Sequence, residues 1–246
     1  NSSETRNLSL NETPRLVLNL PEDGTHIKDT DIILYYTATD NDGFLACDLY
    51  INGIYNQTNS TEISSGEMAN FTLTNPPEGY YNWSVNCTDA GTYSNTNTTA
   101  NSSFIVDRGD PLVGLIAPSE AEVVDITDYV FQWMVNDTFS NITYCNLTIN
   151  GNVNNTSIVS YNNIITNYTI EGLRTGAYNW SVACIDNATN TGHSVLGNFS
   201  VLLPPHIELV SPANDTGDLF NDVTFQYIPS LGSENFTRCS LILNGA

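Results

Sequence analysis

The sequence predicts an all-β protein built from tandem sandwich domains. Short segments alternate apolar and polar residues, which is typical of strands that bury one face. Clusters of Gly, Pro, Asn and Asp separate these segments and indicate turns. The pattern also repeats: Pro14, Pro111 and Pro205 stand at equivalent positions and are 97 and 94 residues apart (111 − 14 and 205 − 111).

A period near 95 residues with about seven short strands has the size of an immunoglobulin-like (Ig-like) sandwich. It is too long for one coil of a solenoid or one blade of a propeller. We therefore divide the chain into residues 1–13, the last strand of a preceding repeat, and two full repeats, 14–110 and 111–204. Residues 205–246 are the first half of a third repeat.

Each strand of the first repeat is bounded by a turn signal. Pro21–Gly24 follows the first strand, Asp40–Gly43 the second, and Asn52-Gly53 the third. Residues 54–67 read as a polar loop with at most a short edge strand. The expected strands are Leu16–Leu20, Ile32–Thr39, Phe44–Asn52, Asn70–Thr74, Tyr81–Cys87 and Ser102–Val106. The second repeat follows the same plan.

The most informative strand is Tyr81–Cys87, which recurs as Tyr178–Cys184. Its Tyr, Trp, Val and Cys residues point to one side of the strand and its Asn and Ser residues to the other. We expect the first side to be buried and the second to face water. The tryptophans Trp83 and Trp180 are predicted to pack in the core.

The third repeat contains Cys239–Gly245, which matches Cys47–Gly53 and Cys145–Gly151. Half a sandwich cannot bury a core of its own. Either the chain is a segment of a longer array of repeats, or a neighbouring chain completes this half by strand addition. We favour a segment of a longer array, because residues 1–13 offer only one strand whereas the third repeat lacks about four.

The cysteines predict one disulfide per repeat. Cys47 and Cys87 are 40 residues apart and Cys145 and Cys184 are 39 apart. A partner for Cys239 is expected 39 or 40 residues further on, outside the given residues. Disulfides indicate an oxidising, extracellular setting at the cell surface. The alternative is a set of buried free thiols in a cytosolic protein.

Composition excludes some partners. The formal net charge is −21 with only six Lys or Arg residues, so no basic surface exists to neutralise nucleic-acid phosphates. No apolar run reaches the roughly 18 residues of a membrane span. No secretory signal is visible at the start of the sequence.

Asn-x-Ser/Thr triplets, the acceptors of N-glycosylation, number 21, about three times what composition alone gives. The excess predicts heavy glycosylation, with N-glycans as the only attached groups. The predicted sites are Asn7, Asn56, Asn59, Asn70, Asn82, Asn86, Asn97, Asn101, Asn136, Asn141, Asn146, Asn155, Asn167, Asn179, Asn187, Asn198, Asn214 and Asn235.

The sequence contains no recognisable catalytic or metal-binding motif, so we predict neither catalytic residues nor metal ligands. His26, His193 and His206 lack metal-ligand spacing and are expected in loops or on the surface. The oxygen-rich segment Asp40–Gly43 could bind Ca²⁺, but its ligand set is short, and a hairpin turn is the better interpretation. A pair of catalytic carboxylates is not indicated at any position.

The segments Gly79–Asp89 and Gly176–Asp186, which share Gly-x-Tyr-Asn-Trp-Ser-Val-x-Cys, resemble a motif of prokaryotic Ig-like surface repeats. Similar Cys-bearing, Asn/Thr-rich repeats occur in archaeal surface proteins. The resemblance covers nearly the whole chain and implies that the two cysteines of a repeat lie on adjacent strands of one sheet. Such repeats serve as stalks, fibres, adhesins and enzyme spacers.

The sequence therefore predicts a non-enzymatic, extracellular structural glycoprotein: a stiff Ig-like array in a surface filament, stalk or coat, which self-associates or joins head to tail. The alternative is an adhesin or carbohydrate-binding module. It would need exposed aromatic residues in the loops 54–67 or 152–166, where only Tyr55 and Tyr161 occur. An enzyme elsewhere in the gene is a third possibility.

Overall fold

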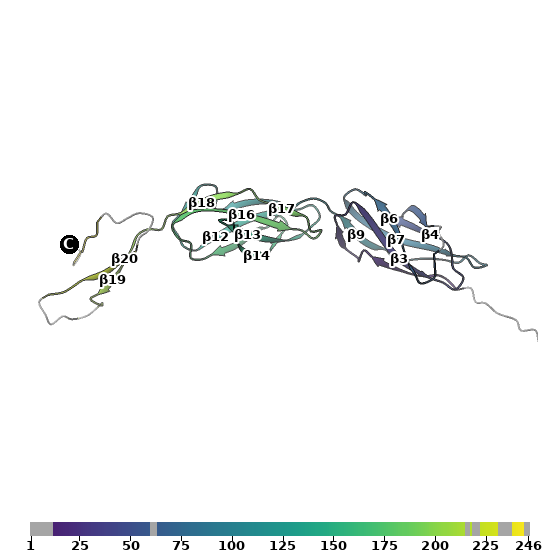
Figure 1. Ribbon diagram of the computed structural model, residues 1–246, viewed down its shortest axis with the longest axis horizontal. Helices are drawn as coiled ribbons and strands as arrows, with labels where there is room; N and C mark the ends of the chain where they lie inside the picture. The colour runs from purple at the N-terminus through teal and green to yellow at the C-terminus, as the bar shows by residue number, and fades with distance from the viewer. Residues whose placement is uncertain (1–11, 60–62, 215–216, 218–221, 231–237, 244–246) are drawn as a thin grey trace, which may run out of the picture. The chain divides into compact units, whose positions relative to one another are not determined.

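A computed structural model describes residues 12–59, 63–214, 217, 222–230 and 238–243 (Figure 1). Every regular element of these residues is a β-strand. The part of the chain described here contains no helix long and apolar enough to cross a membrane. The chain divides into two compact units. Unit 1 comprises residues 1–109, 138–140 and 187–190, and unit 2 comprises residues 110–137, 141–186 and 191–246.

Unit 1 contains two sheets. The three-stranded sheet has the order β1-β3-β6, and the larger sheet has the order β2-β9-β7-β4-β5, with β8 also paired to β7. All pairs are antiparallel except β2 with β9. The strands are β1 (Arg15–Leu20), β2 (Thr25–Ile27), β3 (Asp31–Thr39), β4 (Phe44–Ile51), β5 (Ile54–Asn59), β6 (Met68–Thr74), β7 (Gly79–Asp89), β8 (Thr96–Thr98) and β9 (Ser102–Val106).

Unit 2 repeats this topology, with sheets ordered β10-β12-β15 and β11-β18-β16-β13-β14, and β17 paired to β16. A further two-stranded sheet joins β19 to β20. The strands are β10 (Leu112–Ala117), β11 (Glu122–Val124), β12 (Tyr129–Asn136), β13 (Ile142–Ile149), β14 (Asn152–Tyr161), β15 (Ile165–Ile170), β16 (Gly176–Ile185), β17 (Thr191–His193), β18 (Gly197–Val201), β19 (His206–Ser211) and β20 (Gln226–Ser230).

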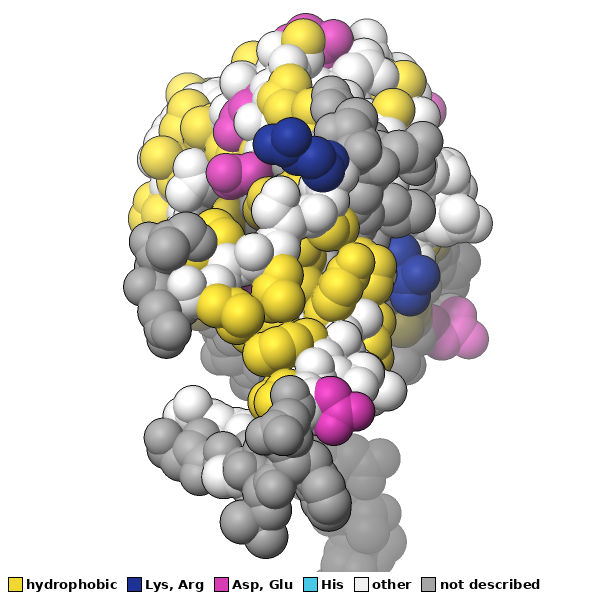
Figure 2. Space-filling model, turned by 90° about the vertical axis from the view of Figure 1, so that its left-hand side faces the viewer, with side chains coloured by type: hydrophobic (Ala, Val, Ile, Leu, Met, Phe, Trp, Pro, Cys, Tyr) yellow, Lys and Arg dark blue, Asp and Glu magenta, His cyan; other side chains and the backbone are white. Residues whose placement is uncertain are grey.

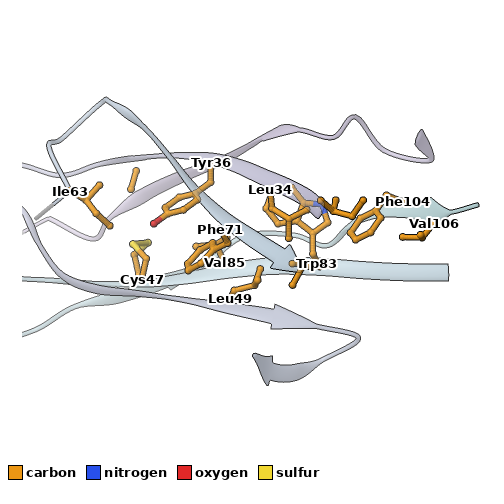
Figure 3. Packing of buried hydrophobic residues seen from close by; sticks show 14 residues of the cluster. Leu34, Tyr36, Cys47, Leu49, Ile63, Phe71, Trp83, Val85, Phe104 and Val106 are labelled. Atoms are coloured by element: carbon orange, nitrogen blue, oxygen red, sulfur yellow. A yellow bond between two sulfur atoms is a disulfide. The ribbon is translucent and has the colours of Figure 1, made fainter. Parts of the chain in front are cut away.

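The core of unit 1 fills the space between its two sheets (Figure 3). Leu34 and Tyr36 enter it from β3, and Leu49 and Trp83 enter it from the larger sheet; all four are fully buried. The ring of Tyr36 stacks on Phe71 with centroids 5.1 Å apart. Burial of apolar and aromatic side chains on this scale is the main force that holds the two sheets together.

The core of unit 2 is built in the same way around Phe131, Trp133 and Trp180. Phe131 packs edge-to-face on Trp180, with ring centroids 5.0 Å apart. The indole Nε1 of Trp133 donates a hydrogen bond of 3.1 Å to Ser160 Oγ, which satisfies a buried donor. Each unit therefore has its own hydrophobic core.

The predicted all-β sandwich fold is confirmed, and each strand expected in the first repeat is present within one or two residues at most ends. Two expectations are corrected. The loop predicted at residues 152–166 is largely strand, because β14 spans Asn152–Tyr161 and pairs along its length with β13. The three-residue strands β2, β8, β11 and β17 lie in segments for which no strand was predicted.

The polar side of β7 is also less exposed than predicted. Asn82 is exposed, but Asn86 is half-buried and Ser84 is buried. The reason is the central position of β7, which pairs with β4 on one side and with β8 and β9 on the other. Alternation identified the side of the strand but could not show how the neighbouring strands cover it.

Candidate functional site

The two predicted disulfides are present, and each joins directly opposed residues of adjacent strands. Cys47 on β4 faces Cys87 on β7, with the Cα atoms 4.0 Å apart. Cys145 on β13 faces Cys184 on β16 at the same separation. All four residues are fully buried. The bridges therefore lie within one sheet, as the resemblance implied, and not between the sheets. Cys239 is an exposed free thiol.

A tyrosine hydroxyl fastens the start of the disulfide-bearing strand in each unit. Tyr81 donates a 2.7 Å hydrogen bond to the carbonyl oxygen of Pro77. Tyr178 donates a 2.9 Å bond to that of Arg174. A tyrosine that bonds to the backbone a few residues upstream of its own strand is a hallmark of Ig-like sandwiches. The alternation of residues predicts that these tyrosines lie on the buried side of their strands, but it does not indicate this contact.

None of the predicted glycosylation sites among the described residues is buried. Two of the predicted asparagines, Asn7 and Asn235, lie outside those residues. The half-buried ones are Asn59, Asn86, Asn146, Asn155 and Asn179. The exposed ones are Asn56, Asn70, Asn82, Asn97, Asn101, Asn136, Asn141, Asn167, Asn187, Asn198 and Asn214.

At least three of these asparagines use Nδ2, the atom to which an N-glycan is attached, in a hydrogen bond. Asn97 donates to the carbonyl oxygen of Pro14 at 2.8 Å, Asn136 to Asn163 Oδ1 at 2.6 Å, and Asn198 to Glu120 Oε1 at 3.1 Å. By contrast, Asn82 is exposed on β7 and contacts Asn52 through its backbone: its N–H donates to Asn52 Oδ1 and its carbonyl oxygen accepts the backbone N–H of Asn52, both at 2.8 Å. The folded chain therefore presents its sequons in chemically different states.

Two surface hollows border on predicted glycosylation sites. One, of about 490 Å³, is lined by β1 residues together with Asn101. The other, of about 330 Å³, is lined by Tyr178, Asn179 and Asn198. Asn179 and Asn198 are direct cross-strand neighbours on β16 and β18. A glycan on one of these asparagines would occupy part of the adjacent hollow.

A carboxylate and a phenol form a short hydrogen bond at the edge of the core of unit 2. Tyr129 donates to Glu122 Oε1 at 2.6 Å, and Ser119 donates its backbone N–H to Glu122 Oε2 at 2.7 Å. These bonds, with Tyr129 first, lower the pKa of Glu122 because they stabilise its charged form. Burial and the nearby carboxylate raise the pKa of Tyr129 to about 12.

The histidines do not gather into a site. His193 and His206 are exposed, as expected. His26, however, is half-buried on β2, and its Nδ1 lies 3.9 Å from Asp107 Oδ2. The expectation of a surface or loop position is therefore wrong for His26, because the short strand β2, which alternation could not detect, carries it against β9.

The oxygen-rich segment 40–43 behaves as a turn. Asp40 Oδ1 accepts the backbone N–H of Asp42 at 2.8 Å, which is the geometry of an Asx turn. Ser65 Oγ donates to the carbonyl oxygen of Asp40 at 2.6 Å and accepts its N–H at 2.9 Å. The side chain of Asp40 thus organises the backbone between β3 and β4.

Unit 2 brings together two carboxylates that the sequence did not pair. Asp137, just after β12, and Asp186, just after β16, are both buried, and an oxygen atom of each lies within 4.8 Å of the other. Carboxylate oxygens are suitable ligands for hard divalent cations. These two residues could therefore contribute ligands to a bound cation.

The aromatic residues considered for an adhesive surface are exposed but do not form a platform. Tyr55 is exposed on β5 and packs edge-to-face on Tyr50 in the same hairpin, with centroids 6.2 Å apart. Its hydroxyl lies 2.8 Å from Thr58 Oγ1. Tyr161 is exposed at the end of β14. Each of the two tyrosines belongs to a different unit.

No family model matches the chain, and no curated protein matches it. Solved structures of other proteins, however, are similar to this chain. A marsupial T cell receptor is 9% identical and superposes with a TM-score of 0.53, covering 80% of this chain and 77% of that one. The fibronectin(III)-like modules of Clostridium thermocellum CbhA are 14% identical, cover 77% of this chain and 94% of theirs, and give a TM-score of 0.44.

The FN1–FN3 domains of chicken CNTN1 are also similar, with 11% identity, a TM-score of 0.41, and coverage of 78% of this chain and 67% of that one. At such identities the likeness concerns the fold. The superposition on the T cell receptor, with its TM-score of 0.53, supports an Ig-like sandwich fold for this chain. Domains of this kind, stapled by disulfides, are typical of extracellular structural or adhesive proteins.

Proposed function

We propose that this chain is a non-enzymatic structural glycoprotein of the cell surface, of the archaeal type that its sequence motifs resemble. The observation that carries the proposal is the placement of the sequons. Every predicted glycosylation site in the described residues lies at least partly at the surface, while both cores are closed around aromatic residues. In this proposal the disulfide-linked domains form a stiff protein scaffold, and the glycans cover its surface.

Glycans would shield the most vulnerable parts of a β protein. Edge strands present unpaired backbone groups that invite aggregation and proteolysis. Asn56 and Asn59 lie on the edge strand β5, and Asn155 lies on the edge strand β14. Prolines at the repeat boundaries, such as Pro14 and Pro111, fix φ and shorten the linkers, which suits a stiff filament, stalk or coat assembled by self-association or head-to-tail joining.

An adhesive or carbohydrate-binding role is the alternative, but no specific observation favours it. The hollow of about 490 Å³ in unit 1 and that of about 330 Å³ in unit 2 are both bordered by predicted glycosylation sites. A glycan attached there would compete with a ligand for the same space. We therefore retain the structural role as the main proposal.

Two measurements test the proposal together. Glycopeptide mass spectrometry of the native protein should find sugars on most of the described sequons, and electron imaging of the native material should show filaments, stalks or a coat. Unmodified asparagines throughout would contradict the glycoprotein role. Saturable binding to a defined sugar on a glycan array would instead favour the adhesive alternative.

A further inference from the structure

Exposed apolar side chains are common on this chain, and Figure 2, which views it from the side of β19 and β20, shows many of them. Isolated exposed apolar residues are normal in soluble proteins and mark no site by themselves. Five of them differ, because each stands two positions before a predicted glycosylation site on the same strand. They are Met68, Tyr80, Met134, Tyr144 and Ile165, on β6, β7, β12, β13 and β15.

Each of these apolar residues shares a face of its sheet with the asparagine that follows it. Residues i and i+2 of a regular strand point to the same face and lie about 7 Å apart. The five strands pair regularly through both positions with at least one neighbour. On β13, for example, Tyr144 opposes Ile185 and Asn146 opposes Ala183. A sugar on the asparagine therefore starts beside the exposed apolar residue.

The best-defined case lies on the larger sheet of unit 2. Tyr144 is directly opposed by Val159 on β14 and by Ile185 on β16, and the three residues are 48%, 44% and 39% exposed. We call these three residues the apolar row. Asn146 lies next to the row, and its sequon is completed by Thr148. Three apolar side chains in register thus border one acceptor asparagine.

Unit 1 provides a natural comparison for this position. Alignment of the disulfide cysteines gives the matched residues, which are Ala46, Asp48 and Thr88 in place of Tyr144, Asn146 and Ile185. An aspartate cannot accept an N-glycan, and the residues around it here are small or polar. The acceptor and its apolar neighbours are therefore replaced together, which is expected if a sugar covers those neighbours.

The side chain of Asn146 is held in a fixed orientation. Its Oδ1 accepts the backbone N–H of Ser157 at 3.0 Å. An N-glycan is attached through Nδ2, so the sugar can be added while this hydrogen bond remains. A fixed amide restricts the positions open to the first sugar, and this lowers the entropic cost of packing the sugar on neighbouring residues.

We propose that the first sugar on Asn146 packs on the apolar row, with one face of its ring against the ring of Tyr144. The C–H groups of a pyranose face are apolar and weakly positive, whereas the face of an aromatic ring is negative, so the two attract while water leaves both. The same arrangement would cover the other four apolar residues. The inference rests on the proposed function and adds that these glycans are part of the folded structure.

The test removes the sequon without altering Asn146. Glycopeptide mass spectrometry of the native protein should first find a sugar on Asn146. The full chain with Thr148→Val then loses the acceptor, whereas the matched control Thr148→Ser keeps it. Nitration by tetranitromethane measures the accessibility of each tyrosine. We expect Thr148→Val to raise nitration of Tyr144 at least threefold relative to the exposed Tyr55 of unit 1, and Thr148→Ser to leave it unchanged.

A second measurement tests whether the sugar and the tyrosine act together. Thr148→Val should lower the urea midpoint of unit 2 in the unaltered background. It should have no such effect in the Tyr144→Ala background, which places at this position the residue type found at Ala46. This double-mutant cycle isolates the contact between the sugar and the ring. A midpoint loss of the same size in both backgrounds would overturn the inference.

Equal nitration of Tyr144 in the Thr148→Val and Thr148→Ser chains would also overturn the inference, because the sugar would then not cover the ring. So would a bare Asn146 in a native chain whose other sequons carry sugars. Each of these results would leave the glycoprotein role standing. A native chain without sugar at any sequon would contradict the proposed function itself, so the two failures are distinguishable.

Discussion

Cys145 and Cys184 face each other across adjacent strands of one sheet, with Cα atoms 4.0 Å apart, and Cys47 and Cys87 do the same in the other unit. Each bridge thus spans about 40 residues of sequence while it joins neighbours in the sheet. Its effect on stability should therefore come from the constraint on the unfolded chain.

Replacing both cysteines of one unit by Ala should destabilise that unit by about 4 kcal/mol, the value that chain entropy gives for a loop of this length. Urea unfolding followed by tryptophan fluorescence measures this loss. Cys47→Ala with Cys87→Ala and Cys145→Ala with Cys184→Ala are matched pairs, and each should act on its own unit. An unchanged unfolding midpoint in both pairs would refute the structural role of the bridges.

The tyrosine hydroxyls should stabilise both units, since Tyr81 donates one hydrogen bond to Pro77 and Tyr178 both donates to and accepts from the backbone of Arg174. Tyr81→Phe and Tyr178→Phe remove the donors to Pro77 and Arg174, and each should cost about 1 kcal/mol of unfolding free energy. Tyr144→Phe is the control, because Tyr144 is exposed on β13, and it should change stability by less than about 0.5 kcal/mol. The same denaturation assay applies, and equal effects of all three changes would disprove the assignment.

Gly192 on β17 should not tolerate a side chain. A Cβ atom there would meet the backbone carbonyl group of Pro111, which cannot move aside as a flexible side chain could. Gly192→Ala should therefore destabilise unit 2 by about 3 kcal/mol, the upper range for overpacking. At Gly114 the nearest atom to a Cβ is 3.9 Å away, an ordinary contact, so Gly114→Ala serves as the control. Thermal melts of the two variants should differ clearly.

The hydrogen bond between Glu122 and Tyr129 should make the stability of the fold depend on pH in both the acid and the alkaline range. The pKa of Glu122 is lower in the folded state, so its contribution is present above the ordinary value of 4.5 and is lost as pH falls through the folded pKa. The pKa of Tyr129 rises from 10.0 to about 12, so its contribution is present below 10 and is lost as pH rises through 12.

Glu122→Gln should therefore flatten the acid limb of the stability curve and cost about 1 kcal/mol at neutral pH, since the site is partly exposed to solvent. Urea midpoints measured between pH 3 and about 11 would show this. Glu120→Gln is a suitable control, because Glu120 bonds to Asn198 and not to a tyrosine. Parallel curves for Glu122→Gln and the unaltered chain would rule out the assigned role.

Glycan occupancy should follow the state of Nδ2, if sugars are attached to folded domains. We expect higher occupancy at Asn82 than at Asn198, whose Nδ2 is held by Glu120. Glu120→Ala should release Asn198 and raise its occupancy severalfold, while Asn82 in the same molecule provides an internal reference. Quantitative glycopeptide mass spectrometry gives both values. Unaltered occupancy at Asn198 would indicate that attachment precedes folding.

The sequence alone determined the fold class, the buried sides of the main strands and the cysteine pairing. These features depend on local alternation and on a repeat that places equivalent residues such as Trp83 and Trp180 in register, and both properties are visible along the chain. The sequence did not reveal β2 or β8, because a three-residue strand has too few residues to show a period.

Only the tertiary structure decided how residues distant in sequence meet. The burial of Ser84 depends on the strands that flank β7, the approach of Asp137 to Asp186 on the turns at the ends of β12 and β16, and the bond from Tyr129 to Glu122 on the chain's path between β11 and β12. Burial is a property of neighbours in space, whereas alternation records only which side of a strand a residue occupies.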